Sequence, residues 1–574
     1  MRLEAMWVRV LRNPPKSGRR FAETGTPAIE AGAPEGAGAG FEGRYVWQKG
    51  LPLSLKKSRP WAVGGKRDNF LVTGGEMLFA PRAMNSEVVL SIDLGTSSTR
   101  TALYGEDGRR IQATTAQENY EVITSLDGGA ELDPGVLLRA VMHCLDHTLN
   151  AHRVDPTLRA RPIVAIGVSC FWHSVVGCDA KGSSLTNIVT WADSRGREEA
   201  AKLRERFDER KMHARTGCML RASFWPAKLR WLERTHHRKF TAVKQWLSPA
   251  EWLQQTLTGE ARCGLAMASG TGLFNATKLI WDPDLVKYCE IDPAHLPVVS
   301  DEPTPVRGRL AQQFPELKDV PWFPGISDGL AGNLGCGANA PGFAAINVGT
   351  SAAVRVLRES KDAQVPYGLF AYRVDAQRYL VGGAISNSGN LRAWCGREMK
   401  LPDEATIEAE FTRRHGPEHG LVVLPFWATE RAPTWDEDAA GAIHGIGQHT
   451  TALDLLQALT EASYQRLARI AALLAAGKHD LSKIIVSGGI ERSAASVQRL
   501  ADVLGETIHT SEESEVTLRG AAVHAWEKLG YSVPAAKIGR GVRPRAKCVK
   551  LYAGEREKQR RLEEALASVY NGFA

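Results

Sequence analysis

Two mostly apolar runs, residues 88–94 and 99–104, flank a polar turn with the sequence Gly-Thr-Ser-Ser at 95–98. This pattern predicts a β-hairpin with Asp93 near the end of its first strand. The turn offers backbone N–H groups, hydroxyls and a glycine without a Cβ, which together suit close contact with an anion. A carboxylate beside such a turn is a candidate ligand for Mg²⁺. An ordinary hairpin with a polar turn is the alternative interpretation.

The same pattern recurs in the second half of the chain. Residues 345–355 again place an apolar run before Gly-Thr-Ser, now at 349–351, and Asn347 stands where the first copy has Asp93. A repeated supersecondary unit indicates a duplicated architecture. The repeat therefore predicts two similar domains that face each other, with two phosphate-cradling turns across one cleft and a metal-binding carboxylate on one side only.

Strand-like and helix-like patterns alternate along the chain, which predicts an α/β fold. The apolar run at 162–169 reads as a buried strand, and the polar and aromatic residues 170–174 follow it, where side chains can meet a ligand. A charged stretch at 197–211 predicts a helix.

The second half contains a strong helix pattern at 452–476, with a capping-box-like start at Thr451 and Asp454. A strand at 483–487 follows, then Gly488-Gly489, then a helix from about 493 to 504. Strand, glycine pair and helix form a place where a nucleotide base or ribose can lie against bare backbone.

Composition and these patterns divide the chain into four parts. Residues 1–84 include a low-complexity stretch and are predicted to be a disordered extension, most simply explained by a start placed too far upstream. Residues 85–338 and 339–531 are predicted to be the two folded domains, and 532–574 a helical C-terminal tail.

The bulk numbers exclude several classes of protein. A hydrophobic content of 43% and a charged content of 24% over 574 residues are typical of a globular chain with two domains. No apolar run approaches the roughly 18 residues of a membrane span. The nine cysteines are scattered, which disfavours a disulfide framework or zinc site and fits a reducing cytoplasm. The net charge is +8, of which residues 1–84 carry +7, so the folded body has no basis for binding nucleic acid.

Both hairpins, the Ser-Asp-Gly turn at 327–329 and the Ser-Gly-Gly turn at 487–489 occur in an order that resembles the FGGY carbohydrate kinases, over about 88–526. The resemblance implies an α/β fold with two actin-like (ribonuclease H-like) domains around a cleft for ATP and sugar. It implies transfer of the ATP γ-phosphoryl group to a sugar or sugar-acid hydroxyl, with Mg²⁺ as cofactor. The expected partners are small molecules, with no nucleic acid or membrane, and a homodimer is a further expectation.

The resemblance also implies roles for individual residues. Asp328 matches the catalytic base, although Asp is also a common N-cap of a helix. Asp93 would organise Mg²⁺. The residues expected to contact ATP are Gly95, Thr96, Ser97, Gly349, Thr350, Ser351, Gly488 and Gly489. The residues expected to contact the acceptor are Trp172, His173, Asp193, Arg195 and Gly329. Lys228 is expected to serve the packing of its helix.

Within the family, the stretches at 172–175 and 190–195 resemble those of bacterial gluconokinases most closely. The implied acceptor is D-gluconate, with Arg195 as the partner of its carboxylate; a structural ion pair is the alternative role of Arg195. Trp172 replaces the usual methionine, which bears on the identity of the sugar. Another FGGY sugar kinase, such as a xylulokinase, is the alternative function. An actin-like ATPase or a non-catalytic binding protein is the alternative of a different class, disfavoured because it needs neither Asp328 nor the His173 stretch.

If the N-terminal extension contributes nothing to the fold, deleting residues 1–83 should leave the melting temperature and the kinase activity unchanged, because its composition does not support burial. Differential scanning calorimetry and an ATP-consumption assay on the full chain and the deletion variant test this. A fall of several degrees in melting temperature would show instead that the extension packs on the body.

Overall fold

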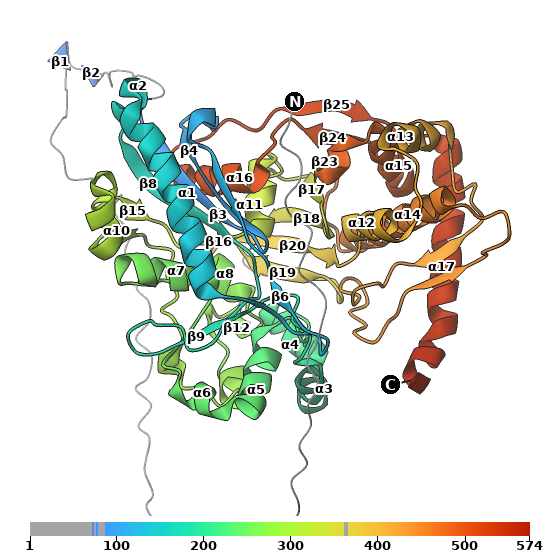
Figure 1. Ribbon diagram of the computed structural model, residues 1–574, viewed down its shortest axis with the longest axis horizontal. Helices are drawn as coiled ribbons and strands as arrows, with labels where there is room; N and C mark the ends of the chain where they lie inside the picture. Colours follow the sequence, from blue (N-terminus) through green and yellow to red (C-terminus); the bar gives the residue numbers. More distant parts are fainter. Residues whose placement is uncertain (1–71, 74–75, 78–85, 361–364, 574) are drawn as a thin grey trace, which may run out of the picture. The chain divides into compact units, whose positions relative to one another are not determined.

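The computed structural model describes residues 72–73, 76–77, 86–360 and 365–573 (Figure 1). The chain divides into two compact units, Met1–Ala80 and Pro81–Ala574. In the first, the short strands β1 (Val72–Thr73) and β2 (Glu76–Met77) pair antiparallel. The remainder of the extension predicted at 1–84 lies outside the described residues. All other described elements belong to the second unit.

Two seven-stranded sheets carry the second unit, and both have the same central order. The first sheet runs β14 (Thr304–Pro305), β15 (Pro321–Trp322), β8 (Ile163–Cys170), β3 (Val88–Leu94), β4 (Ser98–Gly105) and β5 (Ala116–Asn119), with β16 (Ile326–Ser327) also on β8. The second runs β19 (Phe370–Arg373), β20 (Arg378–Ile385), β18 (Ala352–Glu359), β17 (Phe343–Val348), β23 (Lys483–Gly488), β24 (Ile508–Ser511) and β25 (Ile538–Val542). In each sheet a hairpin is followed by a strand parallel to its first arm. The repeat read from the sequence is thus a repeat of structure.

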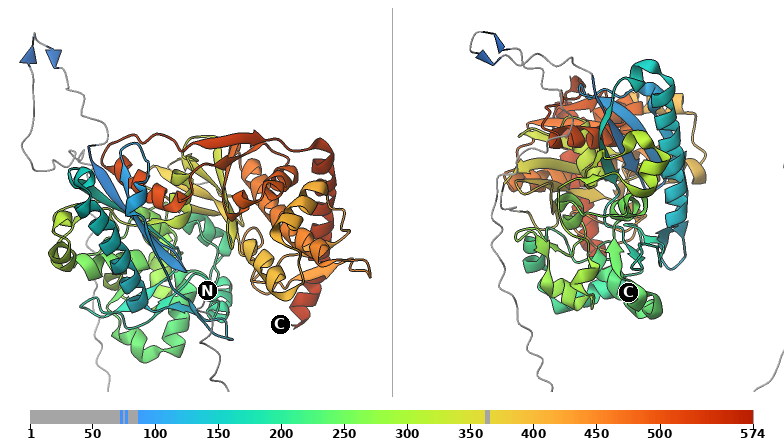
Figure 2. Two further views of the ribbon diagram at one scale, coloured as in Figure 1. Left: turned by 45° about the horizontal axis from the view of Figure 1, so that its top comes forward. Right: turned by 90° about the vertical axis from the view of Figure 1, so that its left-hand side faces the viewer.

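Strand β3 is buried on both faces, and the alternation of its side chains between these faces determines which residues Asp93 contacts. Leu90 and Ile92 point into the core that includes helix α1 (Pro134–Val154). Figures 1 and 2 show this helix, in teal, running along the blue β3–β4 hairpin. Because side chains alternate across a strand, Ser91 and Asp93 lie on the other face, where Ser91 Oγ donates to the Leu518 carbonyl oxygen at 2.5 Å.

Helices α11 (Asp328–Gly335) and α16 (Val516–Lys528) are exchanged between the sheets. Helix α11 follows β16 of the first sheet and packs on β17 and β18 of the second. Helix α16 follows β24 of the second sheet and packs on β3 and β8 of the first. The exchange joins the two sheets into one unit.

Glycines allow the two exchanged helices to cross backbone to backbone. A Cβ on Gly335 would lie 1.7 Å from the Val516 carbonyl oxygen, and one on Gly520 would lie 1.8 Å from that of Ala331. No side chain fits at such separations. Helix α11 carries Asp328, so this crossing also fixes the position of the predicted base.

The helix expected at 452–476 is confirmed as α14 (Ala452–Ala476), with the Thr451 and Asp454 capping box in place. The helix expected at 197–211 is instead two helices, α3 (Arg197–Arg206) and α4 (Glu209–Thr216). The cause is Asp208, whose side chain accepts a hydrogen bond from the Lys211 N–H at 3.1 Å and starts a new helix.

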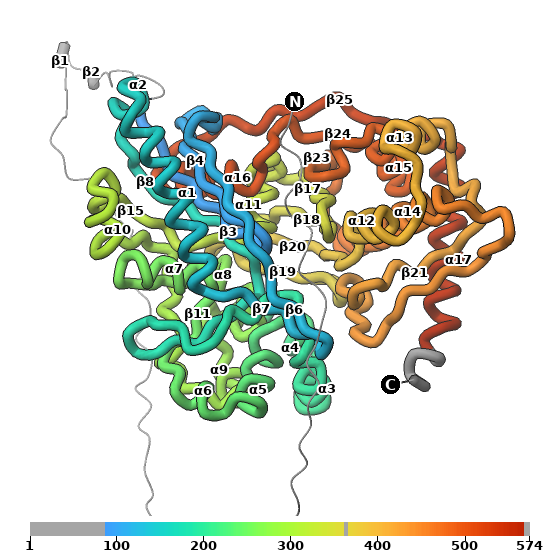
Figure 3. The backbone as a smooth tube through the Cα atoms, viewed as in Figure 1, coloured from blue at the N-terminus to red at the C-terminus, as the bar shows by residue number. Residues whose placement is uncertain are grey.

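The C-terminal segment is more than the helix expected there. After α16 the chain forms β25, which pairs with β24 and extends the second sheet, and then enters the long helix α17 (Ala546–Phe573), as Figure 3 shows. Tyr552 anchors α17, because it is buried and its hydroxyl donates to Glu461 Oε1 at 2.8 Å. None of the helices in the described ranges combines the length and apolarity needed to cross a bilayer.

Replacing Gly520 by alanine should force α16 away from α11 and lower the free energy of unfolding by at least about 2 kcal/mol. The matched control is Gly332→Ala, also in α11, because a Cβ there meets nothing within 4 Å. That variant should gain about 0.5–1 kcal/mol from helix propensity. Chemical denaturation of both variants tests the contrast, and equal stabilities would contradict the crossing.

Candidate active site

Three parallel strands bring the predicted acidic residues to one edge of the first sheet. Asp93 on β3 lies opposite Ser169 on β8. Ser327, the last residue of β16, lies opposite Cys170, the last residue of β8. Because the carboxyl ends of parallel strands meet at one edge, Asp93 and the Asp328 that follows β16 are brought together.

Asp328 is the first residue of α11, and Ser327 is the residue that caps the helix. The Ser327 side chain accepts from the Leu330 N–H at 3.0 Å, whereas Asp328 Oδ1 accepts from the neighbouring Gly329 N–H at 2.6 Å. Burial raises the pKa of the Asp328 carboxyl; the charge of Arg355 opposes this rise and the charge of Asp93 adds to it. The capping role is therefore taken, and Asp328 presents a carboxylate with a raised pKa, as suits a general base.

The charge of Arg355, which comes from the second sheet, acts on this carboxylate. Arg355 lies on β18, and a Cβ on Gly329 would come within 2.9 Å of its Nε. Gly329 is therefore needed for the guanidinium to approach the start of α11. Arg355 Nε is buried and has no hydrogen-bond partner in the described part of the chain.

Asp93 is held by a helix from the far end of the sequence. Its Oδ2 accepts from the Thr517 hydroxyl at 2.8 Å and lies 3.5 Å from Arg100 Nη1. Burial raises the pKa of Asp93, while the Thr517 hydrogen bond and Arg100 lower it. Among the described residues, no group of three or more His, Cys, Asp or Glu side chains is placed to hold a metal. One carboxylate nevertheless fits Mg²⁺, which is commonly bound through one or two carboxylates, waters and substrate phosphates.

The two hairpin turns differ in what their polar atoms already bind. In the first turn, the Thr96 hydroxyl accepts from the Trp191 indole N–H at 3.0 Å, and Ser97 is exposed. In the second turn, the carbonyl oxygens of Gly349 and Thr350 accept N–H bonds at 2.9 and 3.1 Å from the start of α12 (Gly389–Glu398). These two hydrogen bonds hold the turn that contains Ser351 against the start of α12. Both turns keep the glycine and the hydroxyls from which a phosphate site was predicted.

The glycine pair lies beside the second turn. The register of β23 on β17 places Gly488 opposite Val348, directly before Gly349. Gly488 has a φ of 98°, and a Cβ there would lie 2.7 Å from the Val348 carbonyl oxygen, so glycine is required. The Gly488 N–H donates to Glu491 Oε2 at 3.0 Å, and burial raises the pKa of Glu491 to about 6. Glu491 thus binds the backbone of the glycine pair at the predicted adenosine site.

His173 lies just beyond β8 in a strained conformation, with a φ of 63°. Its Nδ1 faces the Gly270 carbonyl oxygen, and burial lowers the pKa of His173 to about 3, so the ring is neutral. Because a carbonyl only accepts, Nδ1 carries the proton and Nε2 is the acceptor of the ring. Lys228 fixes the backbone here by donating to the carbonyl oxygens of His173 and Ser223, each at 2.6 Å.

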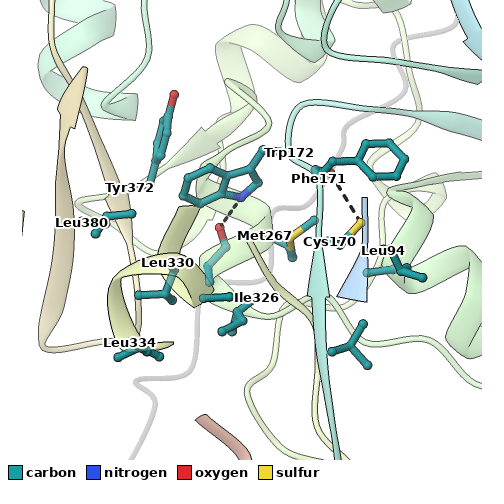
Figure 4. Close-up of a cluster of buried hydrophobic side chains, with 14 of the residues drawn as sticks. Leu94, Cys170, Phe171, Trp172, Met267, Ile326, Leu330, Leu334, Tyr372 and Leu380 are labelled. Atoms are coloured by element: carbon teal, nitrogen blue, oxygen red, sulfur yellow. Dashed lines mark hydrogen bonds between the residues drawn. The ribbon is translucent and has the colours of Figure 1, made fainter. Parts of the chain in front are cut away.

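Trp172 belongs to the packed core beside the site. Figure 4 shows its indole N–H reaching the Ala266 carbonyl oxygen, at 3.2 Å, with Tyr372 on its flank. The two rings meet edge-on with centroids 4.4 Å apart, and Trp172 is 6% exposed. This residue therefore shapes the wall behind His173.

Asp193 and Arg195 form an ion pair with each other. Arg195 Nη2 and Nε lie 2.6 and 3.0 Å from Asp193 Oδ2, and Nη2 also bonds Glu131. Asp193 Oδ2 further accepts the Ala130 N–H at 2.9 Å. The structure thus shows the ion-pair alternative for Arg195, with the guanidinium stacked 4.0 Å from the Trp231 ring.

Two family models match most of the chain. The model of the N-terminal domain of the FGGY family of carbohydrate kinases matches residues 88–335, and the model of the C-terminal domain matches residues 344–526. The chain belongs to the FGGY family of carbohydrate kinases. It is therefore a phosphotransferase that acts on a sugar hydroxyl, with ATP as the substrate that such kinases use.

Individual FGGY kinases agree with this assignment. The chain is 26% identical over 454 residues to gluconokinase of Bacillus subtilis (strain 168), covering 76% of this chain and 86% of the relative. It is 26% identical over 460 residues to glycerol kinase of Xanthomonas axonopodis pv. citri (strain 306), covering 78% and 91%.

Two solved structures also resemble the chain, each with a TM-score of 0.77 over 85% of this chain and 100% of the other. They are gluconate kinase and ligand-bound xylulose kinase from Lactobacillus acidophilus, at 25% and 24% identity. The predicted fold class of two actin-like α/β domains is confirmed.

Sequence reasoning missed three residues at this FGGY kinase site. Thr517 binds Asp93, and the charges of Arg355 and Arg431 act on Asp328, yet none of the three carried a predicted role. Arg355 follows the second turn by four positions, which was the available signal. Thr517 gave none, because its contact with Asp93 depends on the helix exchange.

Asp328→Asn keeps the shape of the side chain but removes the proton acceptor. We expect kcat to fall by about 100- to 10,000-fold while ATP affinity is retained. In the unmodified enzyme, activity should be lost as the pH falls through the raised pKa of Asp328, above the range of an ordinary aspartate. Steady-state rates against pH, together with calorimetric titration of ATP, test both points; near-normal turnover of the variant would eliminate Asp328 as the base.

Proposed function

We propose that this FGGY kinase phosphorylates D-gluconate at its terminal primary hydroxyl, giving 6-phosphogluconate. The observation that carries the proposal is the Asp328 carboxylate at the start of α11, beside Asp93 and within reach of arginines from the second sheet. A base to accept the alcohol proton and cations to neutralise the transferred charge are what phosphoryl transfer requires.

Asp328 accepts the proton of the attacking hydroxyl. Its carboxylate is oriented by the Gly329 N–H, and its raised pKa makes it a better base than an exposed aspartate. The neutral His173 ring accepts a hydrogen bond from an acceptor hydroxyl through Nε2, because Nδ1 donates to Gly270.

The turns of residues 95–97 and 349–351 hold the phosphates of ATP, and Gly488 and Gly489 border the adenosine. Asp93 would hold the Mg²⁺ ion, directly or through water. When bound, Mg²⁺ neutralises charge on the phosphate oxygens. Thr517 and Arg100 orient the Asp93 carboxylate for this role.

The choice of gluconate rests on similarity of sequence. The stretches at 172–175 and 190–195 resemble those of gluconokinases, and the Bacillus subtilis and Lactobacillus acidophilus relatives are named for gluconate. Xylulose is the alternative acceptor. The cytoplasm is the proposed location, because all nine cysteines are buried free thiols, which persist in a reducing compartment.

A panel assay should give the highest kcat/KM with D-gluconate when ATP and Mg²⁺ are supplied and gluconate, xylulose, ribulose and glycerol are compared. A site built for a charged acceptor should reject neutral ones, because its buried charge would remain unpaired. Coupled detection of ADP measures each rate. A higher kcat/KM with xylulose or glycerol than with gluconate would make the substrate assignment wrong and leave the kinase assignment intact.

A further inference from the structure

A kinase of a sugar acid needs a cation for the acceptor's carboxylate, and Arg195 is already occupied. Its guanidinium is shared between Asp193 and Glu131, two acids of the same domain. Turning Arg195 toward a ligand would leave the buried carboxylate of Asp193 and the half-buried carboxylate of Glu131 without their cation, which is strongly destabilising. The carboxylate partner must therefore lie elsewhere.

Arg431, unlike Arg195, is bonded to neutral oxygens and not to acids. Its hydrogen bonds go to neutral acceptors, the Ser386 hydroxyl at 3.2 Å and the Ile385 carbonyl oxygen at 2.9 Å. No ion pair joins it to an acid within the described ranges. The adjacent Glu430 is committed to Arg466, whose Nη2 lies 2.6 Å from Glu430 Oε1.

The charges around Arg431 leave a positive excess. Burial and, to a smaller extent, the charge of Arg355 lower the pKa of Arg431 to about 10, against the opposing effects of Tyr372, Asp328 and Glu430. Asp328 is a nearby acid that forms no ion pair within 4 Å with any cation in the described part of the chain, and its charge also acts on Arg355. Two guanidinium groups against one carboxylate favour the binding of one more negative charge.

Arg431 also lies on the acceptor side of the site. Its Cζ is 4.9 Å from the centre of the Trp191 ring, which belongs to the gluconokinase-like stretch, and its charge acts on His173. Arg431 is half-buried rather than fully enclosed. It comes from the C-terminal family domain, whereas Trp191, His173 and Asp328 come from the N-terminal one.

We propose that Arg431, flanked by Arg355, binds the carboxylate of the acceptor sugar acid and so determines the preference for an acidic over a neutral acceptor. This inference rests on the proposed function. The planar guanidinium matches a carboxylate in two parallel hydrogen bonds, and stacking on Trp191 holds its plane. A neutral acceptor leaves the positive excess uncompensated and is bound less well.

The test compares D-gluconate with D-gluconamide, its uncharged analogue, in the unmodified enzyme and in Arg431→Gln. We expect the unmodified enzyme to prefer gluconate and the variant to lose about 100-fold in kcat/KM for gluconate, with less than about fivefold change for gluconamide. Arg431→Lys, which keeps the charge without the planar fork, should recover part of the preference.

Two further variants separate the effect from charge and from fold. Arg397→Gln removes an exposed arginine of α12 and should leave the ratio of the two substrates unchanged. Arg195→Gln should lower the melting temperature by breaking the ion pairs with Asp193 and Glu131, yet keep the preference for gluconate. A lost preference in Arg195→Gln would overturn the proposal in favour of Arg195.

The remaining outcomes are decisive as well. If the unmodified enzyme does not phosphorylate gluconate, the proposed function fails. If the unmodified enzyme prefers gluconate and Arg431→Gln keeps that preference, only the role of Arg431 is overturned. The same holds if Arg431→Gln loses activity equally with gluconate and gluconamide, a result that would place Arg431 at the phosphoryl group. Should Arg431→Gln not fold, gluconate-dependent thermal stabilisation of Arg431→Lys decides: stabilisation equal to that of the unmodified enzyme would contradict the proposal.

Discussion

The contact on which the rest of the molecule depends is the backbone-to-backbone crossing of α11 and α16. Gly335 and Gly520 remove the side chains that would separate the helices. Each helix ends one family domain and covers the sheet of the other. Because α11 begins at Asp328 and α16 supplies Thr517 to Asp93, the crossing also sets both acidic residues of the site. Packing and chemistry are therefore fixed by one contact.

The two equivalent hairpins differ in charge at one position near the end of the first strand. Asp93 and Asn347 occupy equivalent places, each opposite a serine on the next parallel strand, Ser169 and Ser487. The amide of Asn347 donates to the Ser487 hydroxyl at 3.2 Å and adds no charge. The carboxylate of Asp93 instead keeps a negative charge at the sheet edge. This one difference gives the two equivalent strand ends different charges.

The sequence predicts much of the fold because local signals are strong there. The hairpin at 88–104 and helix α14 follow from apolar patterns and caps, and the Ser-Asp-Gly turn locates Asp328. The partners of charged side chains could not be predicted. Arg195 and Arg431 look alike in sequence, yet one is neutralised by two acids and the other meets neutral oxygens. That difference arises only from tertiary packing.

The exchange of α16 has a consequence for how the chain is made. The face of the first sheet that carries Val89 and Ala165 is closed by Leu518, Ala522 and Trp526. A ribosome releases those residues only after nearly the whole second domain has been synthesised. Until then, one apolar face of the first domain's sheet stays uncovered. Aggregation competes with folding in that state, and chaperones can assist. The order of synthesis thus exposes apolar surface that the finished fold conceals.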